Sequence, residues 1–121
     1  MNSITKLLNI KYPIIQGGMG IGVSLNNLAS AVALEGGIGV IAGALIGFQE
    51  KDISRNPEAA DCRALASEIR AAKAKSRGAA GLLGVNIMVA LVNFAALVRT
   101  ALAEKIDVIF SGAGLPTDLP A

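Results

Sequence analysis

Two patterns of apolar positions alternate along the chain: short continuous apolar runs, and longer stretches in which apolar residues recur at helical spacing. The run at 38–42 is rich in β-branched residues, and the run at 82–89 hardly alternates, which is typical of strands covered on both faces. Together the runs predict strands at residues 13–16, 38–42, 82–89 and 106–110. Because helical patterns separate these runs, the order predicts βα units and a parallel sheet.

Three stretches with apolar residues three or four positions apart predict helices. Ser24 is the expected N-cap of the first, because its hydroxyl can accept a hydrogen bond in the first turn, and the glycine pair after residue 35 is its expected end. Pro57 suits the first turn of the second helix, which runs to about Arg77, and Asn93 can cap the third. The predicted apolar stripes are Leu25, Leu28, Ala29 and Val32; Cys62, Leu65, Ala66, Ile69 and Ala72; and Ala95, Val98, Ala101 and Leu102. Asp61 is expected to lie off the second stripe.

The number of units fits part of a barrel. Three βα units and a fourth strand are present in 121 residues, whereas a closed (β/α)8 barrel needs eight strands and roughly 250 residues. A small doubly wound sheet of four strands is the alternative that the pattern leaves open. Because nothing closes the sheet after Phe110, we expect residues 1–121 to be one incomplete domain, the N-terminal half of a TIM-type α/β barrel.

Composition narrows the classes of function. The chain is 53% hydrophobic with a net charge of +2, which excludes intrinsic disorder. It has no histidine, so no histidine-based metal site, triad or proton shuttle can be built from it, and no metal is expected. Cys62 is the only cysteine and is expected in the core. The sequence shows neither a disulfide nor a secretion signal, and this favours the cytoplasm as the compartment.

Neither nucleic acid nor a membrane is an expected partner. The cations Arg70, Lys73, Lys75 and Arg77 cluster where the second helix should end, and there they offset the helix dipole. Aromatic residues make up only 3% of the chain, which leaves few stacking platforms for bases. The mean hydropathy of +0.58 is high, but glycine and asparagine interrupt the longest uncharged window, residues 78–98.

Glycine-bearing loops follow three of the expected strands. The densest is QGGMGIG at 16–22, and SGAGLP at 111–116 follows the last strand. The loops should meet at one edge of the sheet, where parallel α/β folds bind ligands. Glycine there lets backbone N–H groups approach a phosphate or a flat ring, although a tight turn without a ligand is the alternative.

The standard nucleotide-binding patterns fail. A dinucleotide pattern starting at Gly18 would need glycine at Val23, and no Gly-Lys-Ser/Thr occurs. Asn86 is the unusual polar residue of an apolar strand, and a buried carboxamide is costly unless its hydrogen bonds are met. It either bonds neighbouring backbone or faces a ligand, and the sequence leaves both open.

Four stretches in order, YPIIQGGMG (12–20), GGIGVI (36–41), GVNIMV (84–89) and SGAGLP (111–116), resemble the nitronate monooxygenase family. This family is also called 2-nitropropane dioxygenase-like and includes FMN-dependent enoyl-acyl-carrier-protein reductases. The resemblance implies a TIM-type barrel that binds FMN. It also implies a flavoprotein that oxidises alkyl nitronates with O2, or that reduces enoyl thioesters with NAD(P)H.

The resemblance also implies roles for particular residues. Gly18, Met19 and Gly20 would lie along the isoalloxazine through their backbone groups, and Asn86 would hydrogen-bond the flavin or its chain. Gln16 is expected at most to brace the loop. The family's catalytic base, a histidine, and its phosphate-binding loops are expected beyond residue 121. No catalytic residue is therefore assigned here, and we expect the chain alone to be inactive.

The expected function is that of an FMN-dependent oxidoreductase resembling nitronate monooxygenase, acting on a small molecule. An enoyl-acyl-carrier-protein reductase is the first alternative. The second is a non-catalytic truncated gene product that pairs its open strand edge with another chain, and a homo-oligomer formed through that edge is one such case.

Overall fold

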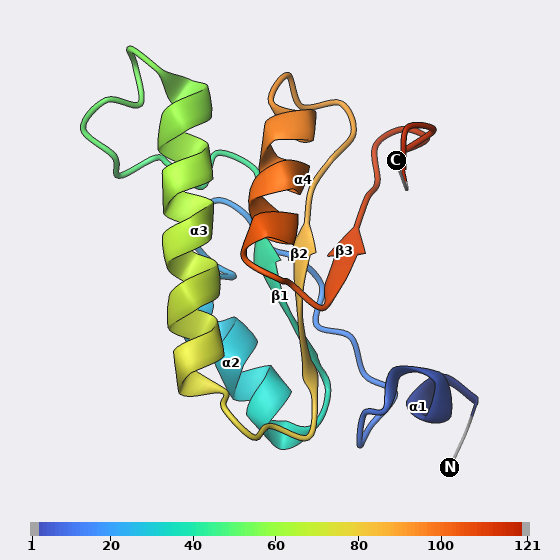
Figure 1. The fold of residues 1–121 in the computed structure, drawn as a ribbon. Helices are drawn as coiled ribbons and strands as arrows, with labels where there is room; N and C mark the ends of the chain where they lie inside the picture. Colours follow the sequence, from blue (N-terminus) through green and yellow to red (C-terminus); the bar gives the residue numbers. More distant parts are fainter. Residues whose placement is uncertain (1–2, 120–121) are drawn as a thin grey trace.

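The computed structural model describes residues 3–119, and its centre is a three-stranded parallel sheet in the order β1-β2-β3 (Figure 1). The strands are β1 (Ile38–Ala42), β2 (Leu82–Asn86) and β3 (Val108–Phe110). This confirms the predicted parallel sheet; β2 and β3 are shorter than predicted, and β1 has the predicted bounds. Since neighbours in the sheet are also neighbours in sequence, the strands follow the order expected around a barrel.

The segment predicted as a first strand, residues 13–16, forms a single bridge and no regular strand. It lies parallel to β1, with Ile15 opposite Ile38, and Gln16 N–H donates to the Ile38 carbonyl at 3.0 Å. Beyond this point the backbone leaves the sheet, and the Gln16 side chain continues the pairing. Its Oε1 accepts from Val40 N–H at 2.9 Å, and its Nε2 donates to the Val40 carbonyl at 3.2 Å. The predicted strand is therefore cut short by a side chain that replaces its backbone.

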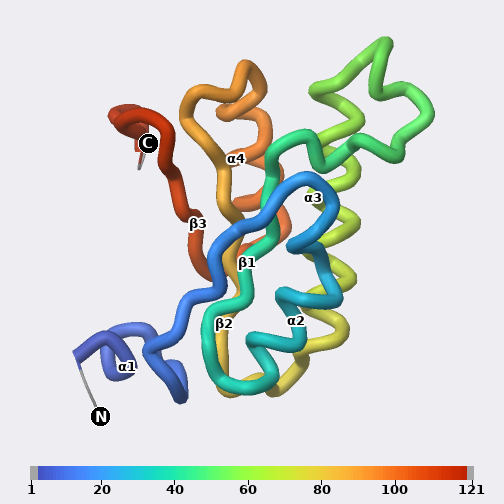
Figure 2. Tube along the Cα trace, turned by 180° about the vertical axis from the view of Figure 1, so that it is seen from behind, coloured from blue at the N-terminus to red at the C-terminus, as the bar shows by residue number. Residues whose placement is uncertain are grey.

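Three helices cover one face of the sheet, and α1 lies apart from them near the amino ends of the strands (Figures 1 and 2). Their bounds are α1 (Ser3–Leu8), α2 (Asn26–Glu35), α3 (Pro57–Lys75) and α4 (Phe94–Ala103). The sequence analysis predicted α2, α3 and α4 but not α1. None of the described helices is long and apolar enough to cross a membrane.

The helix ends follow local rules in three cases. Gly36 ends α2 in the left-handed conformation, with φ at 103°, as predicted. Pro57 occupies the first turn of α3, and the Asn56 side chain caps that helix by accepting from Ala59 N–H at 3.2 Å. Lys73 and Lys75 lie in the last turn of α3, as the dipole argument expected.

One predicted cap is wrong, and a second is correct in position only. Leu25, not Ser24, is the N-cap of α2; Ser24 is buried, and its Oγ donates to the Val40 carbonyl at 2.6 Å. Asn93 occupies the predicted cap position of α4, but its side chain makes no capping bond; its Nδ2 instead donates to Asp61 Oδ2 at 2.8 Å. In both cases a bond to a distant element takes the place of the local one.

The core has two parts, one on each face of the sheet. Between the sheet and the helices, Ile41 and Val85 pack with residues of the predicted stripes of α3 and α4, and Cys62 packs half-buried against them. The opposite face holds Ile38 and Val40, which pack with Ile10, Leu8, Leu82 and Phe110. The chain following α1 therefore covers the amino end of the face that would point into a barrel.

Candidate functional site

The loops that follow the strands gather at the carboxyl end of the sheet (Figure 2). They are residues 17–23, 43–56, 87–93 and 111–116. In barrels and open α/β sheets this end binds ligands, because loops can vary there without disturbing the core.

The glycine-rich loop 17–23 is held at both ends and open between them. At its start, Gln16 donates to the Gly17 carbonyl at 2.6 Å as well as to Val40. At its end, Ser24 N–H donates to the Met19 carbonyl at 2.8 Å. A Cβ added at Gly17 would meet nothing within 4 Å, so the backbone there is accessible. Gln16 thus braces the loop, as the sequence analysis expected.

The structure brings together two of the predicted cofactor-binding residues, Gly18 and Asn86. A Cβ at Gly18 would lie 2.8 Å from the Asn86 Cβ and 3.3 Å from its Oδ1. Only glycine lets the loop backbone approach the carboxamide this closely. Met19 and Gly20 follow in the same loop, and the Met19 side chain is 43% exposed.

The Asn86 carboxamide is only half satisfied. Its Nδ2 donates to the Phe110 carbonyl at 3.2 Å, whereas its Oδ1 accepts no hydrogen bond from any residue in the range 3–119. In register, Asn86 lies between Ala42 and Phe110, so it faces away from the three helices. Of the two roles left open by the sequence, the bond to neighbouring backbone is present, and the oxygen of the carboxamide remains free of any described donor.

Asp61 is a residue of this region whose role the sequence analysis missed. It is only 3% exposed, its Oδ1 accepts from Gly47 N–H at 2.7 Å, and its Oδ2 accepts from Asn93 Nδ2 at 2.8 Å. It thereby joins the β1–α3 loop to the β2–α4 loop. The signal was present, since Asp61 lies four residues before Leu65 and eight before Ile69, on the buried stripe itself.

Charged groups lie at the margin of this end of the sheet. Arg63 Nη2 lies 2.7 Å from Glu50 Oε2 and 2.5 Å from Asp52 Oδ1, in the loop 43–56. The hydrogen bond to Glu50, and then that to Asp52, raises the pKa of Arg63. The two ion pairs join α3 to the loop 43–56. Within residues 3–119, no group of three or more acidic, cysteine or histidine side chains could hold a metal ion.

Gly18 and Asn86 therefore offer backbone groups and one free amide oxygen, and neither side chain is titratable. Such a set can orient a flat polar ring by hydrogen bonds. It provides no group for proton transfer. Ser111 Oγ, at the end of β3, is a further buried polar atom with no partner in the described part of the chain.

The parallel strands follow one another in sequence order, and the loops after them lie at one edge of the sheet. A family model described as nitronate monooxygenase matches residues 1–120. The chain belongs to the nitronate monooxygenase family. Its open parallel sheet with helices on one face is accordingly part of a TIM barrel, as predicted.

Two solved structures are similar in fold to this member of the nitronate monooxygenase family. FabK from Thermotoga maritima superposes with a TM-score of 0.73 at 30% sequence identity, over 97% of this chain and 32% of that one. A point mutant of the same protein gives a TM-score of 0.70 at 31% identity, over 94% and 33%. The chain thus spans about a third of the length of these structures. No curated protein matches.

Proposed function

We propose that this chain forms the part of an FMN-dependent oxidoreductase that receives the edge of the flavin ring, in an enzyme that oxidises alkyl nitronates with O2. The observation that carries the proposal is the close approach of Gly18 to Asn86, whose Oδ1 is left without a donor. Membership of the family supports the class of enzyme.

The residues present fit the ring portion of FMN. An isoalloxazine presents N–H and C=O groups along one edge, so it needs both acceptors and donors from the protein. Asn86 Oδ1 is a free acceptor, and Gly17, Gly18 and Gly20 offer backbone donors that no Cβ of their own shields. The exposed Met19 thioether can lie against an aromatic ring. When bound, FMN would supply the electron transfer.

The chain's own part in the reaction is binding and positioning. Gly18, Met19 and Gly20 would contact the ring, and the anchors at Gln16 and Ser24 keep their loop over the carboxyl end of the sheet. Proton removal from the substrate is assigned to none of residues 3–119. We propose that a histidine outside this sequence performs it, and the cytoplasm as the compartment.

FMN titration of the 121-residue chain tests the proposal, with flavin fluorescence as the readout. We expect Asn86→Ala to raise the Kd about fivefold, because one hydrogen bond contributes about 1 kcal/mol. Gln49→Ala, an exposed amide in the loop 43–56, is the matched control and should leave the Kd unchanged. Absence of FMN binding, or equal Kd values for wild type and Asn86→Ala, would contradict the proposal.

A second candidate is enoyl-thioester reduction, which the similarity to FabK favours. The two candidates differ in what they consume: O2 with a nitronate, or NAD(P)H with crotonyl thioester. Parallel assays of a complete enzyme that contains this sequence separate the two candidates. The 121-residue chain should be inactive in both, and turnover by it alone would show that the missing base is not needed.

A further inference from the structure

The glycine-rich loop 17–23 gains little support from its own side chains. All of its residues are exposed, and the apolar ones, Met19, Ile21 and Val23, are 43%, 50% and 58% exposed. None of these three side chains packs into either apolar core of the described chain. The conformation of the loop therefore depends on contacts that other parts of the protein make with its backbone.

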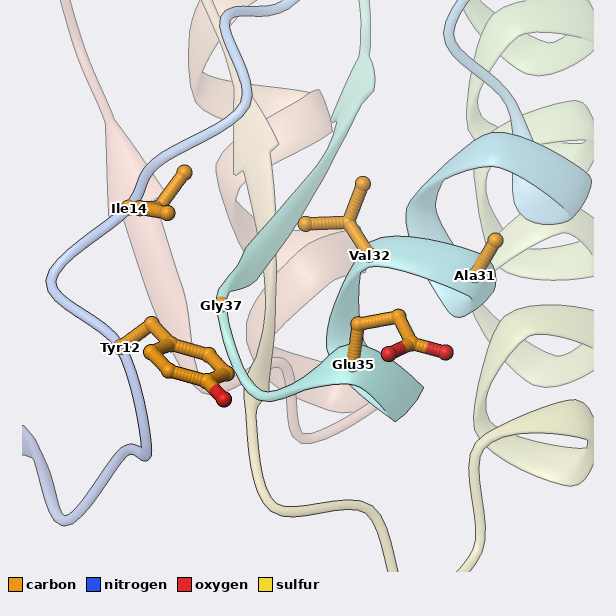
Figure 3. A pocket seen from close by; sticks show the side chains of 6 residues that line it. All are labelled: Tyr12, Ile14, Ala31, Val32, Glu35 and Gly37. Carbon is orange, nitrogen blue, oxygen red and sulfur yellow. The ribbon is translucent and has the colours of Figure 1, made fainter.

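The chain on either side of the loop is fixed to β1. Before the loop, the Ile14 carbonyl accepts from Ile38 N–H at 2.9 Å, and Figure 3 shows Ile14 beside the start of β1, across a groove from Val32. After the loop, the Ser24 carbonyl accepts from Ala42 N–H at 3.0 Å. The part that can change its conformation is thus the loop itself.

The side chains of Asn86 and Phe48 meet the loop, each at a glycine. Asn86 lies against Gly18, near the start of the loop, and Phe48 of the loop 43–56 lies against Gly22, near its end. A Cβ at Gly22 would lie 2.8 Å from Phe48 Cζ and 3.1 Å from its Cε1. Gly22 also has a φ of 75°, a conformation that favours glycine. The tip of the Phe48 ring therefore rests on the backbone of the glycine-rich loop.

The segment that carries Phe48 is attached to the protein on both sides of the ring. Ile46 is 5% exposed and packs in the core between the sheet and the helices. Gly47 N–H donates to Oδ1 of the buried Asp61 at 2.7 Å, and Glu50 N–H donates to the Gly47 carbonyl at 2.8 Å. The Phe48 side chain is 43% exposed, so its neighbours in the backbone, and not a place in the core, hold it against the loop.

We propose that Phe48 is a positioning residue for the flavin ring. Through Gly22 it holds the loop in the conformation in which the backbone from Gly18 to Gly20 can contact the ring, and this inference rests on the proposed function. Phe48 acts through the loop and does not itself bind the flavin. Without its support the loop adopts other conformations as well, and the apparent Kd rises in inverse proportion to the fraction that is competent to bind.

Amide hydrogen exchange of the flavin-free chain tests the support of the loop directly. Ser24 N–H donates to the Met19 carbonyl at 2.8 Å, so its exchange reports opening of the loop. Ala42 N–H, bonded to the Ser24 carbonyl, reports the adjoining strand. We expect Phe48→Ala to speed exchange at Ser24 several-fold and to leave exchange at Ala42 unchanged.

FMN titration of the same variant tests the consequence for binding. Phe48→Ala should raise the Kd about fivefold if the loop is then competent to bind for about one-fifth of the time. Gln49→Ala, at the exposed position next in the chain, is the matched control and should change neither the Kd nor the exchange at Ser24. Circular dichroism should be the same for all three proteins, because neither side chain belongs to a core.

The variant Gly22→Ala tests whether Phe48 acts through this glycine. Its added methyl group would collide with the Phe48 ring, so the Kd should rise in the single variant. The rise should be smaller in the Phe48→Ala background, because the collision disappears with the ring and only the backbone strain remains. Additive effects of the two substitutions would overturn the proposal.

The outcomes separate this inference from the proposed function. Absence of FMN binding by the wild-type chain would contradict the proposed function, and this inference would fall with it. If the wild type binds FMN and Asn86→Ala weakens that binding, but Phe48→Ala equals the wild type in Kd or in exchange at Ser24, the role of Phe48 alone is overturned.

Discussion

Asp61 is the only charged side chain in the described range that is buried, and both of its oxygens are used. Asp61→Ala would leave Gly47 N–H and the Asn93 amide without an acceptor. Unmatched buried donors cost about 1–3 kcal/mol each. We expect the free energy of unfolding to fall by about 2–4 kcal/mol in urea denaturation.

Asp52→Ala is the control for Asp61, because Asp52 is a partly exposed carboxylate paired with Arg63. Exposed ion pairs contribute at most about 1 kcal/mol, so this variant should unfold close to wild type. Equal effects of the two variants would show that burial of Asp61 does not matter.

Single polar residues are where the sequence was least informative. Ser24 and Asn93 both match the preferences of a helix N-cap, and Asn86 matches both a structural and a binding role. Their actual partners, Val40, Asp61 and Phe110, are 16, 32 and 24 positions away. Spacing rules are local, so they cannot choose between a nearby backbone group and a distant one.

The contact between β1 and α2 depends on a glycine. A Cβ at Gly39 would lie 1.8 Å from the Ala29 carbonyl oxygen, which is helix backbone and cannot move aside. We expect Gly39→Ala to remove the cooperative unfolding transition seen by circular dichroism. Gly17→Ala, where a Cβ meets nothing within 4 Å, should keep that transition. A normal transition in Gly39→Ala would contradict the close packing.

The link between α3 and α4 should be sensitive to acid. The hydrogen bond from Arg70 lowers the pKa of Glu104 below its usual 4.5. Its stabilising effect is therefore complete above that value and is lost as the pH falls through the lowered pKa. We expect Glu104→Gln to be less stable than wild type at pH 7, with the difference vanishing in acid. A constant difference across this range would rule out the carboxylate as its cause.

At the scale of elements, periodicity was a good guide wherever packing repeats along the chain. The apolar run of β1 was predicted correctly, and so were the buried positions Leu65, Ile69 and Ala72 of α3. Asp61, which was expected off the α3 stripe, is buried on it. Helix α1 has six residues, too few to show a period. The segment 13–16 was predicted as a strand because nothing local shows that the Gln16 side chain replaces the ladder.

The partial barrel itself could be predicted, because counting βα units needs only the order of elements. The candidate site could be predicted only to the level of which loops meet. The contact between Gly18 and Asn86 joins residues 68 positions apart, and only the folded sheet sets that distance. The family resemblance pointed to both residues, but no local sequence pattern indicates that they are in contact.

The side chains of Gln16 and Ser24 also satisfy the backbone hydrogen bonds of Val40. Both donate to its carbonyl, and Gln16 also accepts from its N–H. The backbone N–H and carbonyl of Val40 are thereby hydrogen-bonded, although the main chain after Gln16 has already left the sheet to form the glycine-rich loop. Another strand therefore cannot pair with β1 at Val40. The glycine-rich loop can change its conformation around a ligand without exposing unpaired backbone groups of Val40.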